Sequence, residues 1–326
     1  MANIQKPFFT ISLDFELFWG VFDVKKISQY ANNILGGRAA IPLMLSLFRE
    51  YNIHATWATV GMASFQNKKQ LLQYIPEITP QYPNTKMDPY LHLKFVGETE
   101  DDDPYHFGYS LLCEIMAVQG MEIGSHSFSH FYCMEQDNPE AFRQDLRASV
   151  DALGRLGILP SSMVFCRNQY TDVDLKTCRE IGFDCFRGNE KNFFYKSRRT
   201  EQPLTIRAAR LIDSYVNLSG NHVCNPFETR IQGLINIPSS RFLRPWVNKT
   251  YLQELFLKRI LLAMTDSAMR GIGFHLWWHP HNFGQNLNQN ISTLQTILDH
   301  YRKLNEDYGM ESLNMKEVSA RFSNKK

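Results

Sequence analysis

Short apolar runs alternate with longer stretches of helical periodicity along most of this chain. The apolar runs have the length and the β-branched or aromatic content of buried strands. They cover residues 8–13, 54–60, 121–123, 163–166, 184–187, 234–237 and 272–278, with a possible last strand at 312–315. Apolar positions at helical spacing predict helices over 38–51, 109–119, 139–156, 174–181, 250–269 and 291–304. This alternation predicts an α/β protein with a mainly parallel sheet.

Polar and charged side chains gather where the predicted strands end. They form four clusters: Asp14 with Glu16, His126 with His130, Arg167, and His279 with His281. In a β/α barrel the carboxyl ends of the parallel strands meet at one face, and that face carries the active site. The four clusters therefore predict a barrel with a site at this face, and their agreement is stronger support than any one of them.

The two histidines suggest a metal centre. His126 and His130 are four residues apart, so on a helical turn both imidazoles would lie on one side. Two neutral imidazoles and one carboxylate suit a divalent transition metal, with zinc first among the candidates. The alternative is two ordinary histidines, one capping a helix and one packing. Zinc proteases place a glutamate directly after the first histidine, but here that residue is Ser127, so any base and third ligand come from elsewhere.

Composition limits the classes of binding partner that we expect, but it does not indicate a reaction. Lysine and arginine number 35 against 33 acids, a net charge of +2, so nothing predicts binding to nucleic acid or to an anionic membrane. No secretory signal and no apolar run of membrane-spanning length is apparent, which predicts a cytoplasmic protein without a membrane span. The six cysteines form no Cys-x-x-Cys pair and are expected to be buried thiols. No feature predicts an oligomeric state.

One segment interrupts the alternation. Residues 75–107 hold five prolines and the acidic run 98–103. An irregular insertion of this length is typical of a functional or mobile loop, and we expect the acidic run to be a solvated face. The length of 326 residues allows one large barrel or two domains.

Several motifs resemble those of the polysaccharide deacetylase family, the metal-dependent carbohydrate esterases with a distorted β/α barrel. Ser12 to Glu16 resembles the first acidic motif of the family, and His126 to His130 resembles its H-[ST]-x-x-H metal motif. Phe165 to Gln169 resembles the arginine motif, and Ile272 to His279 resembles the last motif. The segments 186–190 and 279–284 are similar to a bacterial subgroup associated with surface-glycan genes. The resemblance implies one catalytic domain over residues 1–326, with the insertion at about 75–107, on a distorted barrel of seven or eight mainly parallel strands.

One departure from the family pattern affects the roles of the acids. The family has two adjacent aspartates, one a base and one a metal ligand, whereas this chain has Asp14, Phe15 and Glu16. By analogy Asp14 is the base and Glu16 the third metal ligand. The opposite assignment stays open, and so does loss of the metal.

The resemblance implies a role for each cluster. His126, His130 and Glu16 would hold the metal, and Asp14 would take a proton from the attacking water. His279 would protonate the leaving amine, with His281 as its competitor for that role. The resemblance also assigns Arg167 to orienting the base, with a surface ion pair as the alternative. Substrate contacts are expected from Trp19, Asn168, His281 and Asn282, although core packing is the more common role of a tryptophan.

Three functions follow from these assignments. The first is removal of an N-acetyl group from a sugar in a bacterial glycan or glycan precursor, with a divalent metal, zinc first, as cofactor. The second is an allantoinase-like cyclic amidohydrolase that needs no metal. The third is a carbohydrate-binding protein without catalysis, which the departure in the first acidic motif motivates.

Overall fold

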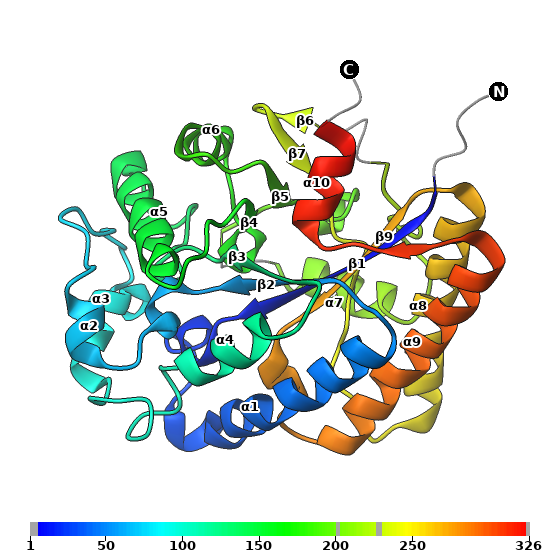
Figure 1. Ribbon diagram of the computed structural model, residues 1–326, viewed down its shortest axis with the longest axis horizontal. Coiled ribbons are helices and arrows are strands. Elements are labelled where there is room, and N and C mark those ends of the chain that lie inside the picture. Colours follow the sequence, from blue (N-terminus) through cyan, green and yellow to red (C-terminus); the bar gives the residue numbers. More distant parts are fainter. Residues whose placement is uncertain (1–5, 200–202, 226–229, 324–326) are drawn as a thin grey trace.

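The computed structural model describes residues 6–199, 203–225 and 230–323 of the chain. One curled sheet runs through it in the strand order β6-β7-β5-β4-β3-β2-β1-β9-β8, and β10 pairs with β1 (Figure 1). Every paired set of strands is parallel except β6 with β7. Helices surround this curled sheet, so the predicted class, a distorted β/α barrel with mainly parallel strands, is confirmed.

The strands are mostly short and buried. Their bounds are Phe8–Phe15 (β1), Ala55–Thr59 (β2), Met121–Ser125 (β3), Ser162–Val164 (β4), Cys185–Arg187 (β5), Arg230–Ile231 (β6), Leu234–Asn236 (β7), Arg241–Phe242 (β8), Gly273–Trp278 (β9) and Glu311–Ser312 (β10). All eight residues of β1 are buried, as expected for a strand covered on both faces.

The α-helices mostly follow the strands. Their bounds are Ile27–Glu50 (α1), Lys68–Leu72 (α2), Pro89–His92 (α3), Tyr109–Met116 (α4), Pro139–Gly154 (α5), Asp172–Ile181 (α6), Leu204–Asp213 (α7), Thr250–Arg270 (α8), Leu287–Tyr308 (α9) and Met315–Ser323 (α10). None of the helices in the described ranges is long and apolar enough to cross a membrane.

The first helix begins earlier than its pattern predicts, and the reason is a close contact. α1 starts at Ile27 instead of residue 38, because Gly36 and Gly37 interrupt the apolar periodicity. A Cβ at Gly37 would lie 2.6 Å from the Cα of His281, and one at Gly36 would lie 2.2 Å from the carbonyl oxygen of Gly284. The two glycines therefore allow the helix backbone to contact the segment that follows β9.

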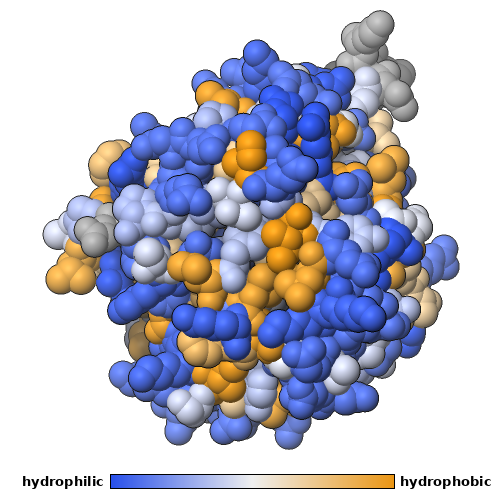
Figure 2. All heavy atoms as spheres, turned by 90° about the vertical axis from the view of Figure 1, so that its left-hand side faces the viewer, coloured by the Kyte–Doolittle hydropathy of each residue, from blue (hydrophilic) through white to orange (hydrophobic). Residues whose placement is uncertain are grey.

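The insertion at 75–107 is more ordered than its composition predicts. It contains α3 and two short 3-10 helices, Thr85–Met87 and Leu93–Phe95. Its acidic run is only partly solvated, because Glu100 pairs with Arg38 and Asp103 is buried against His106. Figure 2 faces the side on which α2 and α3 lie and shows a band of hydrophobic residues between hydrophilic margins.

The last helix closes the amino end of the barrel. The predicted strand at 312–315 is shorter than expected, and Met315 begins α10. Met315, Val318 and Phe322 pack against apolar side chains of β1, β4, β5 and β7. The interior at this end is therefore filled, mostly by apolar side chains.

Glu122 of β3 makes the stability of this closure depend on pH. Its carboxylate is buried and accepts hydrogen bonds from Thr56, Ser162 and the backbone N–H of Lys316 in α10. Burial raises the pKa of Glu122 above its usual value, although these hydrogen bonds lower it. The folded protein therefore binds this proton more tightly than the unfolded chain. The resulting stabilisation is complete below the unfolded pKa of about 4.3 and is lost as the pH rises through the folded pKa.

We expect Glu122→Gln, which keeps the volume but cannot ionise, to reduce this pH dependence. As the pH rises above about 4.3, the free energy of unfolding should fall more steeply for the wild type than for the variant. Urea unfolding at a series of pH values measures the difference. Glu306→Gln, at an exposed position of α9, is the matched control and should follow the wild type. Parallel profiles for the wild type and Glu122→Gln would contradict this role.

Candidate active site

The polar clusters predicted at strand ends come together at the carboxyl end of the barrel. Asp14 and Glu16 lie at the end of β1, His126 follows β3, and His279 follows β9. His279 Nε2 is 3.6 Å from Asp14 Oδ2 and also 3.6 Å from Glu16 Oε1. Residues that are far apart in the sequence therefore lie close together at this end of the barrel.

Glu16 lies at the centre of the group, between two pairs of histidines. Its Oε2 is 3.1 Å from His130 Nε2 and 3.4 Å from His126 Nε2. Its Oε1 is 3.6 Å from His279 Nε2 and 3.9 Å from His281 Nδ1. Burial raises the pKa of Glu16, but the charge of His279 and the close contacts with His126 and His130 outweigh it and hold the pKa well below its usual range.

The segment that carries His126 and His130 is not the helical turn predicted from their spacing. Ser127 and His130 have φ values of 61° and 59°, in the left-handed region. The imidazoles nevertheless converge, with ring centroids 5.1 Å apart. Asp145 of α5 supports this loop, since its buried carboxylate accepts hydrogen bonds from the backbone N–H groups of Phe128 at 2.8 Å and Ser129 at 3.2 Å.

The histidine pair and Glu16 fit a divalent metal. His126 Nδ1 lies 2.8 Å from the carbonyl oxygen of Val164, which only accepts, so Nδ1 carries a hydrogen. In the neutral imidazole the lone pair is then on Nε2, which is buried and makes no hydrogen bond. Tetrahedral zinc ligands with bonds of about 2.0–2.1 Å are about 3.3–3.4 Å apart. The separations of 3.1 and 3.4 Å between Glu16 Oε2 and the two Nε2 atoms are close to that value.

The buried carboxylates of this site need a positive charge nearby, whether the imidazoles are protonated or neutral. Burial lowers the pKa of His130, but Cys166 and Glu16 raise it to about 9. Protonated imidazoles therefore balance the buried acids when no other cation does so. A divalent metal held by neutral imidazoles satisfies the same requirement.

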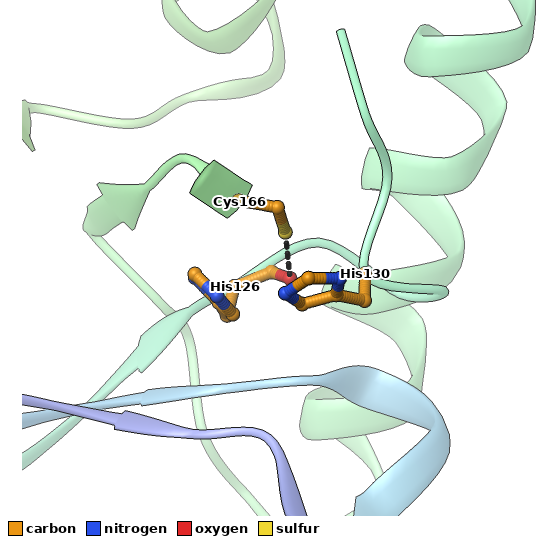
Figure 3. A group of neighbouring side chains, drawn as sticks. All are labelled: His126, His130 and Cys166. Carbon is orange, nitrogen blue, oxygen red and sulfur yellow. Dashed lines mark hydrogen bonds between the residues drawn. The ribbon is translucent and has the colours of Figure 1, made fainter. Parts of the chain in front are cut away.

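Cys166 is a further candidate ligand that the sequence analysis missed. Figure 3 shows its Sγ directed toward His126 and His130, with a hydrogen bond of 3.4 Å to the backbone oxygen of His126. One ligand atom from each of the three side chains lies within 4.8 Å of the others. Burial raises the pKa of the thiol, but the two histidines lower it to about 6. All six cysteines are free, and five are buried as predicted, whereas Cys113 is exposed. Only its place at the end of β4 distinguishes Cys166 in the sequence.

Arg187, and not Arg167, holds the candidate base. Arg187 of β5 donates from Nη1 to Asp14 Oδ1 at 2.6 Å and from Nη2 to Oδ2 at 2.8 Å, and both residues are buried. Burial raises the pKa of Asp14, but the charges of Arg187 and His126 and the hydrogen bonds from Arg187 lower it below its usual value. Arg167 instead donates to Asp23 at 2.5 Å. The predicted contact of Arg167 with the base is therefore wrong, because Cys166 takes the inward position and Arg167 has a left-handed φ of 54°.

The two histidines after β9 differ in their access to solvent. Their rings stack with centroids 5.0 Å apart, and Asn282 Nδ2 lies 3.4 Å from His279 Nδ1. His279 borders a cavity, whereas His281 is buried against α1. Burial and the nearby His279 lower the pKa of His281 to about 4. Of the two, His279 is placed to exchange a proton with a substrate, and Asn282 contacts that ring instead of facing the cavity.

The aromatic contact expected for a sugar comes from a different tryptophan. Trp19 is fully buried in the core and donates to the carbonyl oxygen of His106, so its predicted role in substrate binding is wrong. Trp277 lines the cavity beside His279 and Asn168. The alternation of β9 identifies it, because Trp277 lies on the same side of the strand as His279, whereas Trp278 points into the core.

Comparison with known proteins supports the fold. No family model matches the sequence, and no curated protein matches it significantly. A solved structure assigned as a polysaccharide deacetylase from Mycobacterium smegmatis matches with a TM-score of 0.60 and 12% identity, over 99% of this chain and 93% of the other. A second, from Pseudomonas aeruginosa PAO1, matches with a TM-score of 0.55 and 12% identity, over 98% of this chain and 90% of the other. The Puue allantoinase matches with a TM-score of 0.57 and 11% identity, over 100% of this chain and 93% of the other.

At identities this low the comparisons show the fold alone. The chain has the fold of the polysaccharide deacetylases, so the resemblance inferred from its motifs is confirmed at that level. The same fold occurs in an allantoinase.

We expect Asp145→Ala to weaken metal binding without removing a ligand, because the carboxylate supports the loop of His126 and His130. Outer-shell substitutions of this kind reduce metal affinity by about 10–100-fold. Competition with a chromophoric chelator measures the affinity for zinc. Asp151→Ala, at an exposed position of the same helix, is the control and should bind as the wild type does. Equal affinities for all three proteins would exclude this supporting role.

A second prediction separates Glu16 from Cys166 as the third ligand. The separations from both histidines favour the carboxylate, so Glu16→Gln should lose far more metal affinity than Cys166→Ser. The cobalt-loaded wild type should then lack the intense near-ultraviolet sulfur-to-cobalt charge-transfer band. A band that is present in the wild type and absent in Cys166→Ser would assign the thiolate instead.

Proposed function

We propose that this chain is a metal-dependent hydrolase that removes the N-acetyl group from a sugar of a bacterial glycan or glycan precursor. The enzyme would act on a carbon–nitrogen bond other than a peptide bond. The observation that carries the proposal is the buried Glu16 between two histidine pairs, with Asp14 held ionised beside it by Arg187. The shared fold of solved deacetylases supports the same class.

Each group in the site has a role in this reaction. A divalent ion such as zinc, bound by His126, His130 and Glu16, would polarise the amide carbonyl and lower the pKa of a bound water. Asp14 accepts a proton from the attacking water, and its two hydrogen bonds with Arg187 fix its orientation. His279 donates a proton to the leaving nitrogen, so that acetate and a free amino sugar are released.

Amide hydrolysis on this fold has a second candidate substrate class. The match to an allantoinase supports a cyclic amidohydrolase, which would use the same acids and histidines without a metal. Treatment with a chelator distinguishes the two, since the deacetylase would lose activity and the amidohydrolase would keep it. The cytoplasmic location expected from the sequence stays a prediction.

We expect Asp14→Asn to abolish most acetate release while the metal stays bound. Loss of a general base reduces kcat by about 10²–10⁴-fold. The assay measures acetate released from a panel of N-acetylated sugars, and elemental analysis measures the metal. Asp307→Asn, at an exposed position of α9, is the control variant. Full activity of Asp14→Asn would contradict its role as the base, and a metal-loaded wild type inactive on every sugar would count against the deacetylase.

A further inference from the structure

A cavity with an excess of positive charge opens beside His279. Its volume is about 240 Å³, below the range of roughly 300–1,000 Å³ typical of small-molecule sites, so it suits one group of a larger substrate. Seven cationic side chains line it: Arg167, Lys196, Arg198, Arg210, Arg241, Arg244 and Arg259. Among the described residues that line the cavity, Glu190 is the one acid. The whole chain carries a net charge of only +2, so this concentration is local.

Acids outside the lining neutralise only part of this charge. Arg241 pairs with Asp213 at 2.7 Å, and Arg259 lies 4.0 Å from the same carboxylate. Arg167 pairs with Asp23, as described above. Lys196 and Arg244 make no ion pair with any residue in the described parts of the chain.

Two further arginines line the cavity without an acidic partner among the described residues. Arg210 donates from Nε to the carbonyl oxygen of Phe194, and Arg198 donates from Nη2 to that of Phe193. Both contacts orient the guanidinium groups without neutralising them. The cavity therefore has more cations than its surroundings balance.

Buried donors without partners provide a second and independent observation. Arg241 and Arg259 are each only 5% exposed, yet the Nε of each makes no hydrogen bond. Arg198 Nη1 is also buried without a partner. Buried donors are normally satisfied, and an unsatisfied one costs about 1–3 kcal/mol. The guanidinium groups of these residues are therefore not fully neutralised or satisfied by the protein around them, and their remaining N–H groups leave the cavity with excess positive charge.

We propose that this cavity binds a phosphoryl group attached to the N-acylated sugar, so that the substrate is a sugar phosphate or a sugar diphosphate ester. This proposal rests on the proposed function and specifies its substrate class. A phosphoryl group carries up to two negative charges and offers several acceptor oxygens, and arginine forks bind it in bidentate fashion. A single carboxylate would leave most of the excess charge unbalanced.

Aromatic side chains at the same cavity offer a surface for the sugar ring, between His279 and the arginines. Phe242 and Trp277 have ring centroids 4.6 Å apart, and they lie 5.7 and 5.6 Å from the ring of His279. A sugar ring packed on this aromatic pair would have its amide toward His279 and its phosphoryl group toward the arginines. The cavity and the hydrolytic site thus suit two ends of one substrate.

Binding of three probes tests the proposal: N-acetylglucosamine, its 1-phosphate, and its uridine diphosphate ester. Calorimetric titration into the zinc-loaded wild type should give affinities at least about tenfold higher for the phosphorylated probes, as expected for charged hydrogen bonds. The 1-phosphate and the diphosphate ester show whether one phosphoryl group or two is bound. Glucuronate, a sugar with a single carboxylate, should bind more weakly than the 1-phosphate.

The variants Lys196→Gln and Arg244→Gln locate the phosphoryl group. Lys196 is exposed and Arg244 partly exposed, so folding should be preserved, and thermal unfolding verifies this. Each should lose at least about tenfold in affinity for the 1-phosphate and little for the neutral sugar. Arg147→Gln, at an exposed position of α5 outside the cavity, should bind as the wild type does.

The outcomes separate this proposal from the proposed function. Equal affinity for the neutral and phosphorylated sugars, or equal binding by Arg244→Gln and Arg147→Gln, would overturn the phosphoryl site. Acetate release from neutral sugars with no effect of Lys196 or Arg244 would also overturn it and leave the deacetylase intact. Binding of the phosphorylated sugars that depends on Arg244, without acetate release, would support the phosphoryl site and count against the deacetylase.

Discussion

Glu16 is a carboxylate with almost no access to water, and both of its oxygens face histidines. Burying an ionised acid is costly unless a cation or several donors lie close to it. His126 and His130 face one oxygen, and His279 and His281 face the other, so four imidazoles are arranged around a single charge. The rest of the candidate site depends on this arrangement, because Glu16 brings His126 and His130 to the same end of the barrel as Asp14 and His279.

Contacts outside the candidate site hold its side chains in position. At the amino end, α10 fills the barrel with apolar side chains. At the carboxyl end, Gly37 allows α1 to lie directly against His281, and Asp145 supports the loop between His126 and His130. Polar groups that need precise placement are therefore attached to the ends of buried strands and the helices that cover them.

The sequence was sufficient for the fold class and for most residues of the site, because strand ends in a parallel barrel share one face. It could not identify Arg187 as the partner of the base, since the choice between Arg187 and Arg167 depends on a left-handed residue after β4. The sequence does not distinguish Cys166 from the other cysteines as a ligand, because its position beside the histidines is a tertiary contact. The alternation of β9 places Trp277 on the side of the site, whereas the position of Trp19 in the core depends on the packing of distant segments.

Metal content tests the central claim most directly. Wild-type protein, purified without chelator and dialysed after loading with zinc, should retain about one equivalent per chain by elemental analysis. The double variant His126→Ala/His130→Ala should retain none, while His300→Ala, a histidine of α9 outside the site, should match the wild type. Absence of metal from the loaded wild type, or its retention by the double variant, would contradict the account of Glu16 and its histidines as a metal centre.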